Sequence, residues 1–263
     1  MNRLNTLLTT AVATATLSLA AGTASAATLL ALSADGQLFK IDSAGLAITA
    51  TMPADSPSPL RGIDVRPANG MLYGLGSDNQ LYTLDLATGA ASKAASLNKQ
   101  LPGSGQAVID FNPVADKLRM LAADGTNFRV NVETGEVVVD GSVAYAADGA
   151  YAGKSAQVVA GAYTNSYAGT QATSLYNVDM ASSSLMLQNP PNDGIQQAVG
   201  KIVDGLQNPA LDIASDSKGG NTAYLLTGTT LHTLSLASGK PTPLGEVAGL
   251  PGNIIDIAVL PEM

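Results

Sequence analysis

The chain has 263 residues, of which 13% are charged and 46% are hydrophobic, and its formal net charge is −8. This acidic balance disfavours nucleic acid and anionic membrane surfaces as partners, because phosphate contacts need clustered Lys and Arg. The absence of cysteine excludes disulfides, thiolate metal sites and a lipidated cysteine.

The first 26 residues predict a secretory signal peptide. Arg3 supplies a positive start, a mostly apolar stretch follows from Leu7 to Ala21, and Ala24-Ser25-Ala26 is a small-residue cleavage site. The stretch is too short to favour a membrane span. We therefore expect a mature chain that starts at Ala27 and is exported to the periplasm or the medium. Because Arg3 leaves with the signal peptide, that chain carries 12 basic and 21 acidic residues.

From residue 28 onward, one pattern of alternating apolar and polar residues that ends in a turn recurs five times. The copies are LFKIDSAG at 38–45, LYTLDLATG at 81–89, NFRVNVETG at 127–135, LYNVDMASS at 175–183 and LHTLSLASG at 231–239. Further short runs precede the copies, for example GIDVRP at 62–67 and MLYGLG at 71–76. Gly, Asn, Asp and Pro separate the runs, which indicates strands joined by tight turns.

The spacing of these copies predicts an all-β fold, a five-bladed β-propeller of four-stranded blades. Successive copies are offset by about 43, 46, 48 and 56 residues, and a period in the forties is typical of a propeller blade. The predicted blades are 28–52, 60–99, 107–143, 155–203 and 208–248. Residues 194–206 are also compatible with a short helix or an extended loop of blade four.

The C-terminus is predicted to close the ring. The first unit lacks an innermost strand, and NIIDIAVL at 253–260 matches the innermost strands GIDVRP and VIDFNP (108–113). Completing blade one with this segment would leave no long unpaired edge. Residues 27–263 are therefore expected to form a single propeller domain.

The run from GIDVRPANGMLYGLGSDNQLYTLDLATG through DFNPVADKLRMLAADGTNFRVN, then AYTNS and QNPPNDG, resembles a bacterial family catalogued as domain of unknown function 4394. The resemblance covers nearly the whole mature chain. It implies an exported, propeller-like domain and brings no established activity, substrate or catalytic residue.

The innermost strands share one aspartate position. Asp64, Asp110, Asp212 and Asp256 occupy it in four blades, and Tyr163 takes it in blade four. Two interpretations are open. The carboxylates could hold a hard cation such as Ca²⁺ through oxygen ligands, or each could accept a backbone N–H bond from a neighbouring blade. Repetition in four blades favours the second.

All four arginines of the predicted mature chain lie in blades two and three. They are Arg61, Arg66, Arg119 and Arg129. Arg66 follows Asp64 by two residues, so both point to one face of a strand. These guanidinium groups could clamp an anion or pair with aspartates between blades, and we favour the pairing.

Blades two to four also break the symmetry of the ring, which predicts a ligand site at the channel mouth there. The candidate ligand-binding residues are Arg66, Asn112, Arg119, Tyr163, Asn165 and Asp193. Half of the eight tyrosines, Tyr145, Tyr151, Tyr163 and Tyr167, lie nearby in sequence. They either form a binding surface for a sugar or peptide or fill gaps between blades.

The single histidine, His232, takes the position held by Phe39, Tyr82, Phe128 and Tyr176 in other copies, so it is interpreted as a packed ring. This weakens any Ser-His-Asp scheme and any histidine-based zinc site, and no catalytic residue is predicted.

The sequence thus favours an exported, non-enzymatic, monomeric propeller without a cofactor that binds a protein, peptide or glycan. The alternatives are a Ca²⁺-dependent, lactonase-like hydrolase that uses Asp64, Asp110, Asp212 and Asp256, and a structural envelope or matrix protein.

Overall fold

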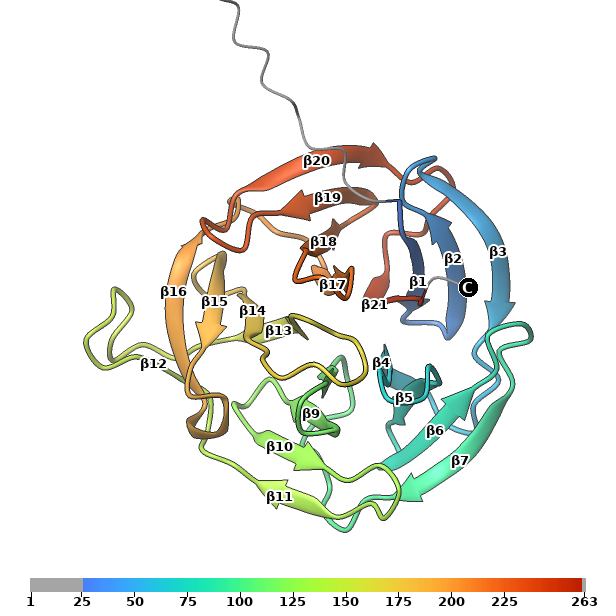
Figure 1. Cartoon of the computed structure of the whole chain (residues 1–263), viewed down its shortest axis with the longest axis horizontal. Helices are drawn as coiled ribbons and strands as arrows, with labels where there is room; N and C mark the ends of the chain where they lie inside the picture. Colours follow the sequence, from blue (N-terminus) through green and yellow to red (C-terminus); the bar gives the residue numbers. More distant parts are fainter. Residues whose placement is uncertain (1–25, 262–263) are drawn as a thin grey trace, which may run out of the picture.

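The computed structural model describes residues 26–261, so nearly all of the predicted signal peptide lies outside the described residues. Within this part of the chain, 21 strands form five sheets arranged in a ring (Figure 1). The five-bladed β-propeller predicted from the repeat is confirmed. No helix in the same range is long and apolar enough to cross a membrane.

In each blade, four antiparallel strands follow one another from the centre of the ring outward. Blade one holds β21 (Ile254–Val259), β1 (Thr28–Ser33), β2 (Gln37–Asp42) and β3 (Ala47–Pro53). Blade two holds β4 (Leu60–Val65), β5 (Leu72–Gly76), β6 (Gln80–Leu84) and β7 (Ala91–Ser96). Blade three holds β8 (Val108–Asn112), β9 (Lys117–Leu121), β10 (Asn127–Val130) and β11 (Val137–Val139). Blade four holds β13 (Val158–Tyr163), β14 (Leu175–Asp179), β15 (Ser184–Gln188) and β16 (Ile195–Lys201). Blade five holds β17 (Ala210–Ser215), β18 (Asn221–Thr227), β19 (Thr230–Leu234) and β20 (Pro241–Glu246).

The C-terminal strand closes the ring as the sequence predicts. β21 pairs antiparallel with β1, with Leu29 opposite Val259 and Leu32 opposite Asp256. Blade one is therefore built from both ends of the chain, and its innermost strand arrives last.

Blade four departs from the prediction. The segment that was also compatible with a helix forms the outer strand β16, preceded by a short 3-10 turn at Pro191–Asp193. An additional strand, β12 (Ala144–Tyr145), pairs parallel with β16, so blade four has five strands. The connection from blade three to blade four protrudes from the ring beside β12 (Figure 1).

The glycine that ends several repeat copies allows neighbouring blades to touch. Gly89 and Gly135 have left-handed φ values of 76° and 75°. A Cβ atom at either would lie 1.9 Å from a carbonyl oxygen of the preceding blade, that of Pro53 or Ser96. The turn therefore needs glycine both for its backbone conformation and for this close approach.

The hydrophobic core is divided among the boundaries between blades. Large apolar clusters fill the boundaries between blades one and two, two and three, four and five, and five and one. Between blades three and four the buried apolar cluster is only Val108, Leu121 and Val158. This boundary contains polar side chains instead, which affects several candidate site residues.

Candidate functional site

The repeated aspartates link neighbouring blades near the centre of the ring. Each accepts a backbone N–H bond from the innermost strand of the next blade: Asp256 from Ile63 (2.8 Å), Asp64 from Phe111 (2.7 Å), Asp110 from Tyr163 (2.9 Å) and Asp212 from Val259 (2.5 Å). Four of the five boundaries carry this bond. These are the inter-blade hydrogen bonds that the repetition favoured, and we call them the staples.

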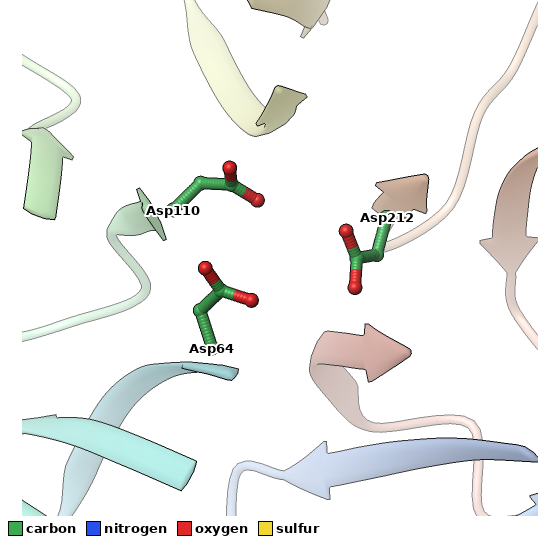
Figure 2. Close-up of side chains that lie close together, drawn as sticks. All are labelled: Asp64, Asp110 and Asp212. Atoms are coloured by element: carbon green, nitrogen blue, oxygen red, sulfur yellow. The ribbon is translucent and has the colours of Figure 1, made fainter. Parts of the chain in front are cut away.

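Three of these carboxylates also meet one another. One carboxylate oxygen from each of Asp64, Asp110 and Asp212 lies within 4.8 Å of the other two (Figure 2). We call these three residues, together with Asp256, the hub. All four side chains are at least nine-tenths buried. Their shared position in the repeat was predicted from the sequence, and the closed ring brings the side chains together.

Burial and mutual repulsion shape the electrostatics of the hub. Desolvation raises the pKa of Asp64, Asp110 and Asp256 well above the usual value, and repulsion from neighbouring hub carboxylates raises it further. Desolvation also raises the pKa of Asp212. The rise stops at about 6, because the backbone hydrogen bonds from Val259 and Ile213 stabilise the ionised carboxylate. The hub therefore favours protons or a cation over free negative charge.

The chemistry of the hub fits a hard cation better than a catalytic centre. The atoms that could bind a metal ion in the hub are carboxylate oxygens, the type of ligand that Ca²⁺ prefers. Asp64, Asp212 and Asp256 each accept a second backbone N–H bond from the next residue of their own strand, which occupies further acceptor capacity. Their burial leaves little access for a substrate.

Tyr163 replaces the aspartate in blade four and turns to the polar boundary between blades three and four. Its hydroxyl accepts a bond from Nε of Arg119 at 3.2 Å, and both side chains are buried. Arg119 also donates from Nη1 to Asn127 (2.6 Å) and Asp140 (2.5 Å), and from Nη2 to Asn192 (2.8 Å). Two of the predicted binding residues are thus brought together, but inside a blade boundary.

Arg66 ties blade two to blade three. Its guanidinium forms a two-point ion pair with Asp116 and a further contact of 3.1 Å with Glu133. The pairing raises the pKa of Arg66 and lowers that of Asp116. Arg66 thus follows the favoured interpretation of an Asp–Arg pair between blades.

The other arginines differ from that interpretation. Arg119 and Arg129 share Asp140 of their own blade. Arg61 is held by the carbonyl groups of Leu101, Pro102 and Gly105.

The remaining candidate residues are separate from one another. Asn112 accepts the N–H bonds of Val114 and Ala115 and so shapes the turn after β8. Asp193 is exposed in the short 3-10 turn before β16. Asn165 anchors a loop to blade five. The six predicted ligand-binding residues therefore lie in several places around the ring.

The loop between β13 and β14, residues 164–174, is the longest connection between the two inner strands of a blade, with 11 residues against 4 to 6 in blades two, three and five. The N–H group of Asn165 donates to Oδ1 of Asn221 (2.8 Å), Nδ2 of Asn221 donates back to Oδ1 of Asn165 (2.9 Å), and the N–H group of Ser166 donates to Oγ of Ser215 (2.9 Å). We call these three bonds the latch. The loop extends over the centre of the ring in the view of Figure 1. This loop was not predicted from the sequence, where only the long interval before Leu175 could have indicated it.

The four tyrosines do not form one surface. Tyr145 donates to Asp179 (2.5 Å), and the hydroxyl of Tyr151 lies 3.2 Å from that of Ser184, so both pin the protruding segment to blade four. Tyr163 is buried, and only Tyr167 belongs to the 164–174 loop. Of the four, Tyr163 lies at a boundary between blades, where its hydroxyl accepts a hydrogen bond from Arg119.

His232 lies half-buried on β19, with Nδ1 at 3.2 Å from the carbonyl oxygen of Thr230. A surface hollow of about 340 Å³ lies in blade two between residues 70 and 92, and none of the candidate residues lines it. Neither feature adds a catalytic group to the hub or to the loop.

Fold and site together define a five-bladed β-propeller with a buried carboxylate hub. The chain belongs to the family described as Domain of unknown function (DUF4394), whose profile matches residues 48–258. No curated protein matches the chain.

Three solved structures from Bacteroides are similar to this chain. A protein of unknown function from Bacteroides thetaiotaomicron aligns with a TM-score of 0.56 and 16% identity, over 88% of this chain and 61% of that one. A protein of unknown function from Bacteroides caccae gives 0.46 and 12%, over 90% and 100% of the two chains. An auxiliary nutrient binding protein from Bacteroides ovatus gives 0.46 and 14%, over 74% and 55%. This chain spans about three-fifths of the length of the first structure. At 16% identity the likeness to the first structure concerns the fold alone.

Proposed function

We propose that this chain is an exported, non-enzymatic binding protein that holds a protein, peptide or glycan with the loops at the end of the ring where the innermost strands finish. The 164–174 loop is the main contact. It breaks the symmetry of the ring, and it carries no charged residue in a chain that is otherwise acidic.

The observation that supports this proposal is the anchored state of the loop. The latch holds its start, and Oγ of Thr173 donates to the carbonyl oxygen of Thr164 (2.6 Å) near its end. Between these points Ala168, Gly169 and Gln171 are exposed and Tyr167 is half-exposed. A surface that is already ordered loses little conformational entropy on binding.

The test is binding by the purified mature protein to arrays of glycans and peptides, followed by titration of each hit with variants. Tyr167→Ala should weaken binding by roughly 1–3 kcal/mol if the ring is an anchor. Tyr151→Ala, in the protruding segment, is the matched control and should bind as the wild type does. Equal affinity of Tyr167→Ala and wild type for every hit would overturn the proposal.

The second candidate is the Ca²⁺-dependent, lactonase-like hydrolase, which the convergence of Asp64, Asp110 and Asp212 supports. It requires a stoichiometric metal in the purified protein and a hydrolase activity that EDTA removes. A protein that has neither, and that binds no ligand through the loop, would instead fit the structural envelope or matrix role.

A further inference from the structure

The surface hollow of blade two, which we call the blade-two hollow, lies at the same end of the ring as the 164–174 loop. Gly70 and Met71, which line it, belong to the connection from β4 to β5, at the end where the innermost strand β4 finishes. The other lining residues come from the end of β6, the turn that follows it and the start of β7. A volume of about 340 Å³ is at the lower end of the range of ligand pockets and suits a group as small as one side chain.

The blade-two hollow combines an apolar lining with one negative charge. Leu72 and Leu84 are buried, Leu86 is half-buried and Met71 is 46% exposed. Among the described residues that line the hollow, Asp85 alone is charged. This lining fits an alkyl chain that ends in a cation, because such a chain packs its methylene groups on apolar surface and keeps its charge near water.

The carboxylate of Asp85 has capacity for a partner. The N–H groups of Ala87 (2.9 Å) and Thr88 (2.8 Å) and the hydroxyl of Thr88 (2.9 Å) all donate to Oδ1. These bonds, that of the Thr88 hydroxyl most, lower the pKa of Asp85 and so favour its ionised form. Within residues 26–261, no ion pair involves Asp85 and no hydrogen bond ends on its Oδ2. This oxygen can therefore accept a bond from outside the chain.

The repeat shows what is missing in blade two. Thr83 is the third residue of its copy, and the third residue is Lys40 in blade one and Arg129 in blade three. The basic residue nearest to Thr83 in sequence, Lys93, does not replace them. It pairs with Tyr82, so it points to the opposite face of the sheet from Thr83.

Blade five has threonine at the third position too, Thr233, but it carries a basic residue across the turn. The fifth residue of the copy donates its N–H group to the carbonyl oxygen of Ala90 in blade two and of Lys240 in blade five. Blades one, three and five thus each hold a basic residue in this part of the outer sheet, whereas blade two holds Thr83 and Ala90. Small side chains and an unpaired carboxylate occur together there.

We propose that the blade-two hollow binds a basic side chain, lysine or arginine, of a polypeptide partner. The apolar residues pack against its methylene groups, and Oδ2 of Asp85 accepts a hydrogen bond from its charged end. The partner supplies the positive charge that the other three blades carry on their own residues. The formal net charge of −8 favours the approach of a basic partner. The inference does not rest on the proposed function, because the hollow and the 164–174 loop share no residue.

The experiment is an NMR titration of the mature protein with three capped glycine pentapeptides whose central residue is lysine, arginine or norleucine. Norleucine has the alkyl chain of lysine without the ammonium group. The lysine and arginine peptides should cause saturable shifts of the amide signals of residues 70–72, 83–86 and 90–92. The norleucine peptide should bind about two- to fivefold more weakly, as expected for the loss of one exposed ion pair.

Two variants test the parts of the site. Thr83→Lys gives blade two the residue of blade one, so it should fill the hollow and abolish the shifts. Asp85→Asn keeps an oxygen for the turn, as Asn131 does in blade three, and should weaken the lysine peptide to the level of the norleucine peptide. Asp42→Asn is the matched control, because Asp42 accepts the same kind of turn bonds in blade one, and it should bind as the wild type does.

The titration of the wild type decides the proposal even if Thr83→Lys does not fold. Absence of saturable shifts at these residues, or equal binding of the norleucine peptide, would overturn it. Equal weakening by Asp42→Asn and Asp85→Asn would also overturn it, since general attraction by the acidic chain would then explain the binding. Tighter binding of n-butylammonium than of the lysine peptide would indicate a free amine in place of a polypeptide. Tyr167→Ala should leave the shifts unchanged, which separates this site from the 164–174 loop.

Discussion

The boundary between blades three and four and the boundary between blades four and five join the same blade to its neighbours by different means. The first has a staple from Asp110 and a buried polar network around Arg119, with three buried apolar residues. The second has no staple, a large apolar cluster that includes Leu211, Ile213 and Leu225, and the latch at its mouth.

The difference shows that blades of one repeat can pack through two kinds of chemistry. Apolar packing needs only size and shape, and it stabilises in proportion to the area buried. The polar network needs every partner in place, because a buried group that loses its partner costs more than an ordinary contact contributes. The symmetry of blade four is therefore broken on both sides, where Tyr163 replaces the aspartate and where the 164–174 loop is anchored.

Removing the closing strand β21 should have the largest effect. It affects blade one and its boundaries with blades two and five, which are separate from the two boundaries compared above. Deleting residues 253–263 removes the buried residues Ile254, Ile257 and Ala258 together with the Asp256 staple, and exposes the edge of β1. We expect loss of soluble, cooperatively folding protein, measured by expression, size-exclusion chromatography and thermal unfolding. A soluble truncated chain with the wild-type unfolding temperature would contradict ring closure.

Breaking the polar boundary should come next. Arg119→Met removes the buried donor of Asn127 and Asn192 and one of the two arginine partners of Asp140, and it should cost about 1–3 kcal/mol in the free energy of unfolding. Arg129→Met is the control, because it shares Asp140 but has a side chain that is 31% exposed, and it should cost clearly less. Equal losses in denaturant unfolding would show that the polar boundary is no more sensitive than the surface.

The latch should matter less, since apolar packing supports its boundary. Asn221→Ala removes the paired bonds to Asn165, which are partly buried, and should cost about 1 kcal/mol. Gln197→Ala, whose amide makes one exposed bond to Asn189, is the comparison and should be nearly neutral. Hydrogen exchange of the 164–174 loop should rise in the first variant only. An unchanged exchange rate would mean that the latch does not order the loop.

The smallest effect is expected at His232, which lies on β19 of blade five, a blade that packs against blade four mainly through apolar side chains. His232→Phe replaces one half-buried ring by another and should change the free energy of unfolding by less than about 1 kcal/mol, because a swap of similar size is well tolerated. Any binding or hydrolytic activity found should survive the change. Complete loss of such an activity with the fold intact would show that the histidine has a chemical role.

Much of the architecture is encoded locally and was accessible from the sequence. Alternation along each run and the turn residues between runs define strands and hairpins, so the blades, their order and the closing strand could be predicted. The staples could be predicted too, because Asp64, Asp110, Asp212 and Asp256 hold one register position in strands that the ring places side by side. Four of the five copies lie on the third strand of their blade, so the repeat carries such information, whereas the copy at 175–183 lies on β14, the second strand of blade four.

Only the tertiary structure decided which side chains meet across the ring. Arg119 reaches Asn192, which lies 73 residues further along the chain, and Asn165 reaches Asn221, which lies 56 residues further. These pairings depend on how the outer part of one blade lies against the next, which no period in the sequence specifies. The same geometry brings three hub carboxylates within 4.8 Å and spreads the predicted ligand-binding residues over several boundaries. Local sequence fixes the direction of a side chain on its strand, whereas its partners depend on the rotation of whole blades around the closed ring.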